Sequence, residues 1–326
     1  MTTTSNDHQP PGSRRVDVIV VTWNTRDLTV AALRRLLDTE QGCDVRVIVR
    51  DNGSTDGTAP AVAEDVPEAV LDHDDRNLGF AAGVNRALEL STAEWVLLLN
   101  SDAWPTPGAI GWLIDAAVAH PEAAAVAARI EDPEGRLEHS THPFPSVRVA
   151  LGMALGLPRL SRRWAERNLI EGAWHHDTAR DVDWAIGAAL LIRRRALDEI
   201  GGLDERYFMY AEDLEWCWRA RSAGWTVRFE PASRFVHVGN ASGRQRYAGR
   251  RTAAHLTNSY RFFRQAHGRA ALWGYRTANV AGTLRQLLVG IVRRDRDAIR
   301  YWKTVMVAHL TPTPDDDPGR FIADPS

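Results

Sequence analysis

The stretch that decides the fold is Glu94-Trp95-Val96-Leu97-Leu98-Leu99-Asn100-Ser101-Asp102, a short apolar run that ends in an amide, a hydroxyl and a carboxylate. An apolar run of this length, without Gly or Pro, is typical of a strand buried on both faces of a mostly parallel sheet. In such sheets ligands bind in the crevice outside the carboxyl ends of the strands. Asp102 is therefore a candidate to hold a divalent cation against phosphate oxygens. A strand that ends in an Asx turn, closed by Pro105 and Pro107, explains the stretch equally well.

Strand-like and helix-like segments alternate on both sides of this stretch, which predicts βαβ units and an α/β fold. Upstream, strands are expected at residues 16–22, 45–49 and 69–71, and helices at 26–38 and from 80 onward. Downstream, helices are expected at 108–119, 194–200 and 211–221, and strands at 123–130, 182–193, 225–230 and 235–238.

The 326 residues are enough for one large α/β domain with an appendage. We expect a disordered N-terminus at residues 1–14, the α/β domain at 15–243, a basic helical extension at 244–310 and a disordered acidic tail at 311–326. Residues 143–180 form a loop-rich insertion of a length that usually serves as a lid or a binding region. The extension is expected to break at Gly268, Gly274 and Gly282.

The composition indicates the cellular compartment. Cys43 and Cys217 give neither a disulfide framework nor a CxxC pair, which indicates a reducing, cytoplasmic setting. The first 13 residues lack the apolar core of a signal peptide, and no apolar run is long enough to predict a membrane span.

Positive charge is concentrated in one segment toward the C-terminus. Residues 244–303 carry 14 Lys+Arg and only two Asp, with Trp273, Tyr275 and Trp302 among them. Two interpretations stay open: an interfacial helix on an anionic membrane, or a solvated face that packs on the acidic remainder of the chain. Nucleic acid is not an expected partner, because the basic residues belong to no recognisable motif.

Polar clusters follow four of the expected strands, at residues 22–24, 51–54, 76–85 and 100–102. Each cluster alone is ordinary turn chemistry, but four that meet at one sheet edge predict a nucleotide pocket. Asp51 is placed to accept from a base or ribose, and Arg76 and the amides after it to face a diphosphate. The candidates for this nucleotide pocket are Thr22, Asn24, Asp51, Ser54, Arg76, Asn77, Gly79, Phe80, Gly83, Asn85, Asn100 and Ser101.

Two common phosphate-binding motifs are missing. The first expected strand is followed by Trp23 and Asn24 instead of the GxGxxG fingerprint, which disfavours a nicotinamide enzyme. The GxxxxGK[ST] loop is also absent, which argues against a P-loop NTPase. A sheet without either needs another way to neutralise a diphosphate, and a metal on Asp102 supplies it.

The remaining candidates each have a plain structural alternative. His237 is either a second metal ligand or a satisfied core histidine. Glu212 and Asp213 either cap a helix, or one of them is a general base for an acceptor hydroxyl. Trp184, Trp216, Trp218 and Trp225 suit a sugar-stacking wall or a core; we expect Trp216 and Trp218 to divide between these roles, with Trp216 on the acceptor side.

In this order the segments resemble the inverting family-two glycosyltransferases of the GT-A fold, and most closely their bacterial rhamnosyltransferase-like branch. The carriers are Val20–Asn24, Asp51–Gly57, Arg76–Phe80 with Gly83–Asn85, Leu99–Asp102, Gly187–Ala188, Gly202–Tyr210, Glu212–Arg219 and His237. Each segment is weak alone, but the ordered set across residues 16–243 is specific.

The resemblance implies a GT-A catalytic domain at residues 15–243, a Rossmann-like, mostly parallel sheet with flanking helices. It makes Asn100-Ser101-Asp102 the DxD-type motif, with Asp102 and His237 as ligands of Mg²⁺ or Mn²⁺. It makes Asp213 the base, with Glu212 beside it, and places Trp184 and Gly187 on the acceptor side. Many relatives have Asp where this chain has Asn100, so we expect modest metal affinity that depends on the donor diphosphate.

The implied reaction transfers rhamnose or another hexose from a dTDP-, UDP- or GDP-linked donor to a hydroxyl of a saccharide or polyprenyl-linked acceptor, in cell-wall or surface-polysaccharide synthesis. The implied location is the cytoplasm, peripheral on the inner face of the plasma membrane. Two alternatives are kept: a sugar-nucleotide nucleotidyltransferase, although its usual Gly-rich opening loop with Arg and Lys is absent, and a non-catalytic nucleotide-sugar-binding protein.

Overall fold

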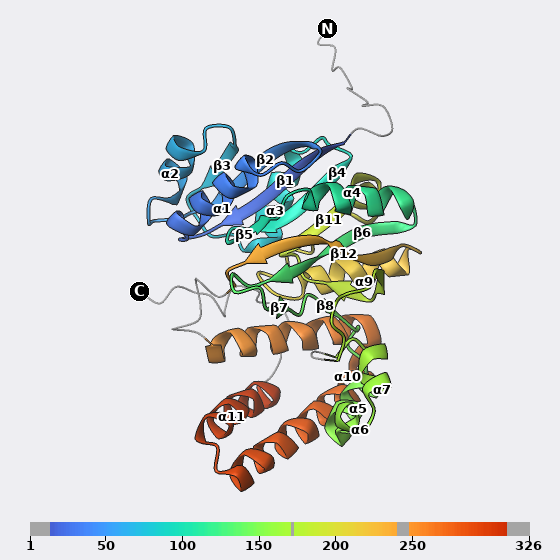
Figure 1. The fold of residues 1–326 in the computed structure, drawn as a ribbon. Helices are drawn as coiled ribbons and strands as arrows, with labels where there is room; N and C mark the ends of the chain where they lie inside the picture. Colours follow the sequence, from blue (N-terminus) through green and yellow to red (C-terminus); the bar gives the residue numbers. More distant parts are fainter. Residues whose placement is uncertain (1–13, 171–172, 240–247, 312–326) are drawn as a thin grey trace.

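The computed structural model describes residues 14–170, 173–239 and 248–311. Within these residues a ten-stranded sheet has helices on both faces, and the helices formed by residues 147–167, 248–293 and 296–310 lie below it, as Figure 1 shows. The main path of the sheet is β3-β2-β1-β4-β11-β6-β12-β5, with β7 paired to β6 and β9 paired to β12. Both expected disordered ends, apart from residues 14 and 311, and the boundary near residue 243 lie outside the described residues.

The N-terminal half of the sheet is parallel, as the alternation of segments predicted. Its strands are β1 (Arg15–Thr22), β2 (Asp44–Asn52), β3 (Val70–Asp74) and β4 (Trp95–Asn100), joined by α1 (Arg26–Asp38), α2 (Thr58–Asp65) and α3 (Phe80–Glu89). In register, Thr22 lies beside Asp51, and Val21 lies beside Asn100. The strand ends that carry the polar clusters therefore meet at one edge.

The other half mixes directions. It contains β5 (Ala103–Pro105), β6 (Ala123–Glu131), β7 (Leu137–Glu138), β9 (Arg180–Val182), β11 (Ala189–Arg193) and β12 (Thr226–His237). Strand β11 runs antiparallel to both β4 and β6, whereas β12 runs parallel to β6 and antiparallel to β5. The pairing of β12 with β5 sets His237 opposite Ala103, next to the end of the deciding stretch.

Two expected strand assignments were wrong. Residues 182–193 are not one strand, because β10 (Trp184–Ala185) pairs with β8 (Thr141–His142) in a separate two-stranded sheet before the chain enters β11. Conversely, residues 225–230 and 235–238 belong to one strand, β12, whose register shifts between Glu230 and Arg234. A continuous apolar run does not reveal where a chain changes sheets.

Both faces of the sheet are covered, so β4 is buried throughout its apolar part. Val96 and Leu98 point into one core cluster, and Trp95, Leu97 and Leu99 point into the other. Helices α1, α2 and α4 (Ala109–Ala119) cover the second cluster, and α3, α8 (Arg194–Ile200) and α9 (Glu212–Ser222) cover the first. Each fully buried aliphatic side chain stabilises the fold by about 1.5–3 kcal/mol.

The insertion is more helical than expected, with α5 (Val147–Leu155), α6 (Leu157–Leu160) and α7 (Arg162–Arg167). Helix α10 (Ala248–Arg293) packs along α5, and α11 (Arg296–Leu310) folds back on α10 (Figure 1). Of the three glycines expected to break the helix, only Gly268 does (φ 80°, ψ 173°). Gly274 and Gly282 stay helical and face Val147 and Ala154 of α5. No helix in the described ranges is long and apolar enough to cross a membrane.

Candidate active site

The rim at the ends of β1 and β2 is held by its own hydrogen bonds. The buried Thr22 hydroxyl lies 2.9 Å from that of Thr25 and 2.8 Å from that of Thr29, so it anchors the start of α1. Asn24 adopts φ 51°, which Asn tolerates better than most residues. Its backbone N–H donates to Ser54 Oγ (2.8 Å), and its Oδ1 accepts from the N–H of Thr55 (2.8 Å). Asn24 and Ser54 thus fasten the two strand-end loops together.

Asp51 lies at this rim and retains the capacity to accept a further hydrogen bond. It is fully buried, and its Oδ1 accepts from the N–H of Ser54 at 2.9 Å. Its Oδ2 has no hydrogen-bond partner among the described residues and lies 3.7 Å from His73 Nδ1. A buried carboxylate oxygen without a donor costs free energy, so this atom suits a ligand donor such as a base or ribose group.

In the segment between β3 and α3, the candidate residues mainly fix the conformation of the backbone. Asn77 Oδ1 accepts from the N–H of Gly79 at 2.9 Å, and Gly79 has φ 88°. A Cβ on Gly79 would lie 2.5 Å from the carbonyl oxygen of Phe208, the same oxygen that accepts from the N–H of Phe80. Only glycine therefore allows this close approach.

Farther along α3, two donor-binding candidates serve packing. A Cβ on Gly83 would lie 2.9 Å from Val21 Cγ1, so Gly83 lets α3 sit against β1. Asn85 donates to the Leu203 carbonyl (2.8 Å) and accepts from the Leu203 N–H (2.9 Å), so its amide holds a distant loop. Arg76, before α3, presents an exposed cationic side chain.

At the end of β4, Asp102 and His237 come together. Asp102 Oδ1 lies 3.1 Å from His237 Nε2, and Asn100 Nδ2 lies 3.1 Å from the same ring nitrogen. His237 Nδ1 donates to Glu138 Oε2 at 2.7 Å. Burial lowers the pKa of His237, but hydrogen bonds to Asp102 and Glu138 outweigh it and raise the pKa to about 9. Ser101 Oγ lies 3.4 Å from the Thr25 hydroxyl.

This donor set fits a divalent cation. Carboxylate oxygen and imidazole nitrogen are accepted by Mn²⁺, and Mg²⁺ accepts the oxygen. If Asp102 and His237 hold a cation, the Nε2 proton is lost while Glu138 fixes the Nδ1 proton, a common outer partner of metal-bound histidine. The described residues contain no group of three His, Cys, Asp or Glu placed to hold a metal, so further ligands of a cation here would come from other groups, such as water or the phosphate oxygens of a bound nucleotide.

Glu212 and Asp213 begin α9 after two residues with positive φ, Tyr210 (71°) and Ala211 (73°), an uncommon and strained backbone. Asp213 Oδ2 accepts from the N–H of Gly187 (3.1 Å), and its Oδ1 accepts from the N–H of Leu214 (2.8 Å). Burial outweighs these hydrogen bonds and raises the pKa of Asp213 to about 6.

Glu212 is buried, and its Oε2 finds no donor among the residues that the structure describes. Burial and the charge of Asp213 raise the pKa of Glu212 well above its ordinary value. Asp213, with a pKa near 6, is suited to general-base chemistry.

The segment Gly187–Ala188 joins the two halves of the site. The N–H of Gly187 donates to Asp213, and the Ala188 carbonyl accepts from the N–H of Asn100 at 3.1 Å. The carboxylate that can act as a base and the strand end that can hold a metal are thus fixed to consecutive residues. Phe80 lies across from Gly187, 3.7 Å from where its Cβ would be.

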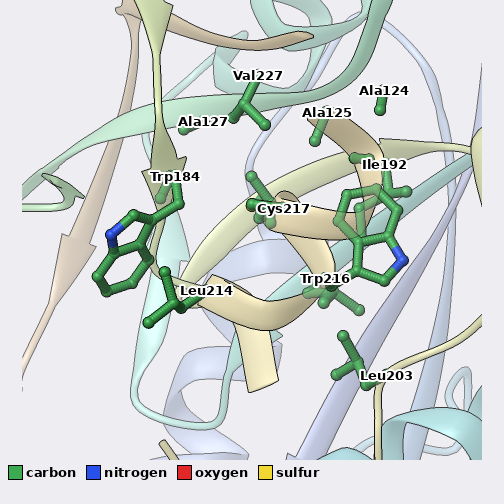
Figure 2. Packing of buried hydrophobic residues seen from close by; sticks show 14 of the residues in the cluster. Ala124, Ala125, Ala127, Trp184, Ile192, Leu203, Leu214, Trp216, Cys217 and Val227 are labelled. Carbon is green, nitrogen blue, oxygen red and sulfur yellow. The ribbon is translucent and has the colours of Figure 1, made fainter. Parts of the chain in front are cut away.

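The tryptophans divide differently from the expectation. Trp216 is fully buried, and its indole N–H donates to the Gly201 carbonyl at 3.0 Å; it belongs to the core cluster with Ile192 and Leu203 (Figure 2). It offers no face to a sugar, so its placement on the acceptor side needs correction. Trp184 is 7% exposed and donates to the Pro143 carbonyl at 3.0 Å. Trp218 is the half-buried one.

Glu138 is the residue that sequence reasoning missed. It lies in a two-residue strand, too short for a periodic signal. The turn chemistry at residues 134–136 was the available signal, because a hairpin there brings Glu138 back beside Ile130 of β6.

Comparison with known proteins gives concordant results. The sequence model of glycosyl transferase family 2 matches residues 17–201. The N-acetylglucosaminyl-diphospho-decaprenol L-rhamnosyltransferase of Mycobacterium tuberculosis (strain ATCC 25618 / H37Rv) is 34% identical over 254 residues, which cover 74% of this chain and 80% of that protein. The pre-mycofactocin glycosyltransferase of the same strain is 31% identical over 242 residues, 70% of this chain and 43% of that protein.

Among solved structures, the mannosyltransferase PcManGT from Pyrobaculum calidifontis in complex with GDP-Man and Mn²⁺ superposes with a TM-score of 0.57 at 19% identity. The superposition covers 91% of this chain and 85% of that one. At this identity the similarity shows the fold.

Proposed function

The chain belongs to glycosyl transferase family 2 and is a glycosyltransferase, and from that premise we propose that it moves a hexose from a nucleoside-diphosphate donor to a saccharide hydroxyl on a polyprenyl diphosphate. The observation that carries the proposal is the link through Gly187–Ala188, which fixes the Asp213 carboxylate next to the end of β4. The name of the mycobacterial relative supports rhamnose as the sugar and a decaprenol-type acceptor.

In the proposed donor site, the unsatisfied Asp51 Oδ2 accepts from the base or ribose, and Arg76 faces the diphosphate. Asp102 and His237 would hold Mg²⁺ or Mn²⁺, which when bound would supply positive charge near the leaving diphosphate. Donors linked to dTDP, UDP or GDP all carry this diphosphate. Glu138 orients His237 from behind.

Asp213 takes the proton of the acceptor hydroxyl as its oxygen attacks the anomeric carbon, on the face opposite the leaving diphosphate. A single displacement of this kind inverts the configuration. Burial and the charge of the neighbouring Asp213 favour the protonated form of Glu212.

We also propose that the enzyme works in the cytoplasm, on the inner face of the plasma membrane. An exposed apolar stripe (Trp273, Leu284, Leu288, Ile291 and Val292) runs along the outer side of α10. The exposed Arg293, Arg294 and Arg296 follow it at the turn into α11, where they complement anionic lipids. Tyr275 does not belong to this surface, because its ring stacks on Phe263 with centroids 4.2 Å apart.

The function is tested by screening dTDP-, UDP- and GDP-sugars for thermal stabilisation with Mn²⁺ or Mg²⁺, followed by transfer to a polyprenyl-diphosphate N-acetylglucosamine. We expect metal-dependent stabilisation by one donor and a disaccharide product detected by mass spectrometry. Release of pyrophosphate from a nucleoside triphosphate and a sugar phosphate would instead identify a nucleotidyltransferase. Donor binding without transfer or hydrolysis would identify a binding protein.

Membrane association is tested by co-sedimentation with phosphatidylglycerol vesicles. Leu284→Ser with Leu288→Ser should weaken binding, whereas Val118→Ser, an equally exposed apolar position on α4, should not. Equal binding by all variants would rule out the α10 stripe as the contact.

A further inference from the structure

A pocket of about 670 Å³ lies away from the candidate active site, between the insertion, β9, the C-terminal half of α9 and α10. Phe144 and Trp218 form an aromatic wall, edge to face with ring centroids 5.0 Å apart. His267 of α10 meets the other side of Trp218, at 5.0 Å. None of the chemistry derived above uses this pocket.

The carboxylates that line the pocket are already matched by charge. Asp183 forms an ion pair with Arg221 at 2.7 Å and accepts from the N–H of Phe144 at 2.9 Å. Asp181 forms an ion pair with Arg228 at 3.2 Å. Neither carboxylate is therefore available to neutralise further arginines.

Three more arginines line the same pocket without a carboxylate partner in the described part of the chain. Arg148 donates only to the neutral Asn168, at 3.4 Å. The Arg180 guanidinium lies over the Trp174 ring, 5.0 Å from its centroid, and Arg167 is exposed at the end of α7. Three uncompensated guanidinium groups around one hollow repel one another, and an anion with several oxygens removes that repulsion.

The position of the pocket selects the anion. Trp218 and Arg221 follow Asp213 on α9 by five and eight residues, which is about 8 and 12 Å along the helix. On its other side the pocket reaches α5 and His267 of α10, and α10 carries the proposed lipid-facing stripe beyond Gly268. An anion held here lies between the base and the membrane, the place of the phosphates in a lipid-linked acceptor.

We propose that this arginine pocket (Arg148, Arg167 and Arg180) binds the diphosphate of the polyprenyl-linked acceptor and so positions its sugar toward Asp213. The inference rests on the proposed function. It adds an acceptor phosphate site formed by the insertion, β9 and α9, separate from the donor diphosphate site at the ends of β1, β2 and β4. The aromatic wall of Phe144 and Trp218 is available to the first groups next to the phosphates.

The kinetic test compares two acceptors. One is N-acetylglucosamine diphosphoryl farnesol, and the other is an octyl glycoside of N-acetylglucosamine, which has no phosphate. For Arg148→Gln with Arg167→Gln we expect KM for the diphosphate acceptor to rise at least tenfold, with kcat unchanged. KM for the octyl glycoside should stay within twofold of the wild-type value.

Arg163→Gln is the matched control, because Arg163 is exposed on α7 one turn before Arg167 and does not line the pocket. It should behave as wild type with both acceptors. Equal KM changes for the two acceptors, or no change for either, would overturn the proposal. If the wild-type enzyme transfers to neither acceptor, the proposed function fails, and the pocket is then judged by binding alone.

Binding is measured by calorimetry with inorganic pyrophosphate and with farnesyl diphosphate, after the donor site has been saturated with nucleoside diphosphate and metal. Both probes should bind the wild type and Arg163→Gln, and lose affinity at least tenfold in the double variant. If the double variant instead loses only binding to phosphatidylglycerol vesicles, the pocket serves phospholipid headgroups and the proposal is wrong.

Discussion

The two sides of the candidate active site are built in different ways. On the donor side, polar side chains near the strand ends mostly bond one another, as Asn24 does with Ser54 and Thr55, and the segments come from consecutive βαβ units. On the acceptor side, Asp213, Glu212 and the arginine pocket come from distant segments, and several of their charges lack partners among the described residues.

The two sides differ in how many of their polar groups are already hydrogen-bonded within the protein. A rim that is satisfied internally is rigid before any ligand arrives, so it can position a donor with little loss of conformational freedom. Buried or crowded charges without partners raise the free energy of the empty site and favour ligands that satisfy them. We therefore expect substitutions on the acceptor side to change rate and pH dependence, and substitutions near the metal pair to change metal and donor affinity.

The largest effect is expected on the rate of transfer, when the base on the acceptor side is removed. Asp213→Asn keeps an acceptor atom for the N–H of Gly187 but removes the base, so kcat should fall by about 10³-fold or more. Donor affinity, measured by calorimetry with metal, should stay within a few fold of wild type. Retention of more than a tenth of the wild-type turnover would show that another group accepts the proton.

The next largest effect is expected on the donor side, as a loss of metal affinity. Glu138→Gln removes the carboxylate that fixes His237, and loss of such an outer partner typically costs about 10–100-fold in metal affinity or activity. Mn²⁺ titration in the presence of donor measures the change. Glu134→Gln, an exposed carboxylate of the adjoining turn, is the control. An equal effect of both substitutions would assign the loss to the turn instead of His237.

The third effect is a pH dependence that we expect for the rate of transfer but not for donor binding. Because burial raises the pKa of Asp213 to about 6, the base is protonated below that pH, and kcat/KM should fall about fivefold between pH 6 and pH 5. The pair with Glu212 titrates as a unit, so the measured value belongs to the pair. Donor binding, measured in parallel by calorimetry, should not show the same acid limb. If donor binding falls in step with rate, the limb does not report the base.

The donor side was largely predictable from sequence because its signals are local. The apolar run that ends at Asp102, together with three similar strand ends, indicated a parallel sheet and the edge at which these residues meet. His237 lies 135 residues later, yet β12 had a recognisable apolar end, and its pairing with β5 places the ring beside Asp102. Their roles as ligands remain predictions.

The acceptor side was not predictable to the same degree. Trp216 and Trp218 are two residues apart on a helix and thus face nearly opposite directions, and sequence alone does not tell which face meets the sheet. Glu138 lies in a strand of two residues, and the arginine pocket brings together Arg148, Arg167 and Arg180 from different segments of the insertion. Such sites depend on tertiary packing, which no short-range pattern records.

The smallest expected effect is one of stability, and it tests whether the acceptor side is strained. The folded-state pKa of Asp213 is raised from 3.8 to about 6, so protonation favours the folded state, and this stabilising contribution is lost as pH rises through about 6. At pH 8 the neutral Asp213→Asn variant should be more stable than wild type by about 1–3 kcal/mol, a rise of roughly 2–4 °C in Tm, and the difference should become small near pH 4. Asp204→Asn is a control of opposite sign, because hydrogen bonds from Arg206 outweigh the effect of burial and lower the pKa of Asp204. Its loss should destabilise the protein at pH 8. If both variants shift Tm in the same direction there, the Asp213 carboxylate is not strained, and its raised pKa does not reflect a cost carried by the fold.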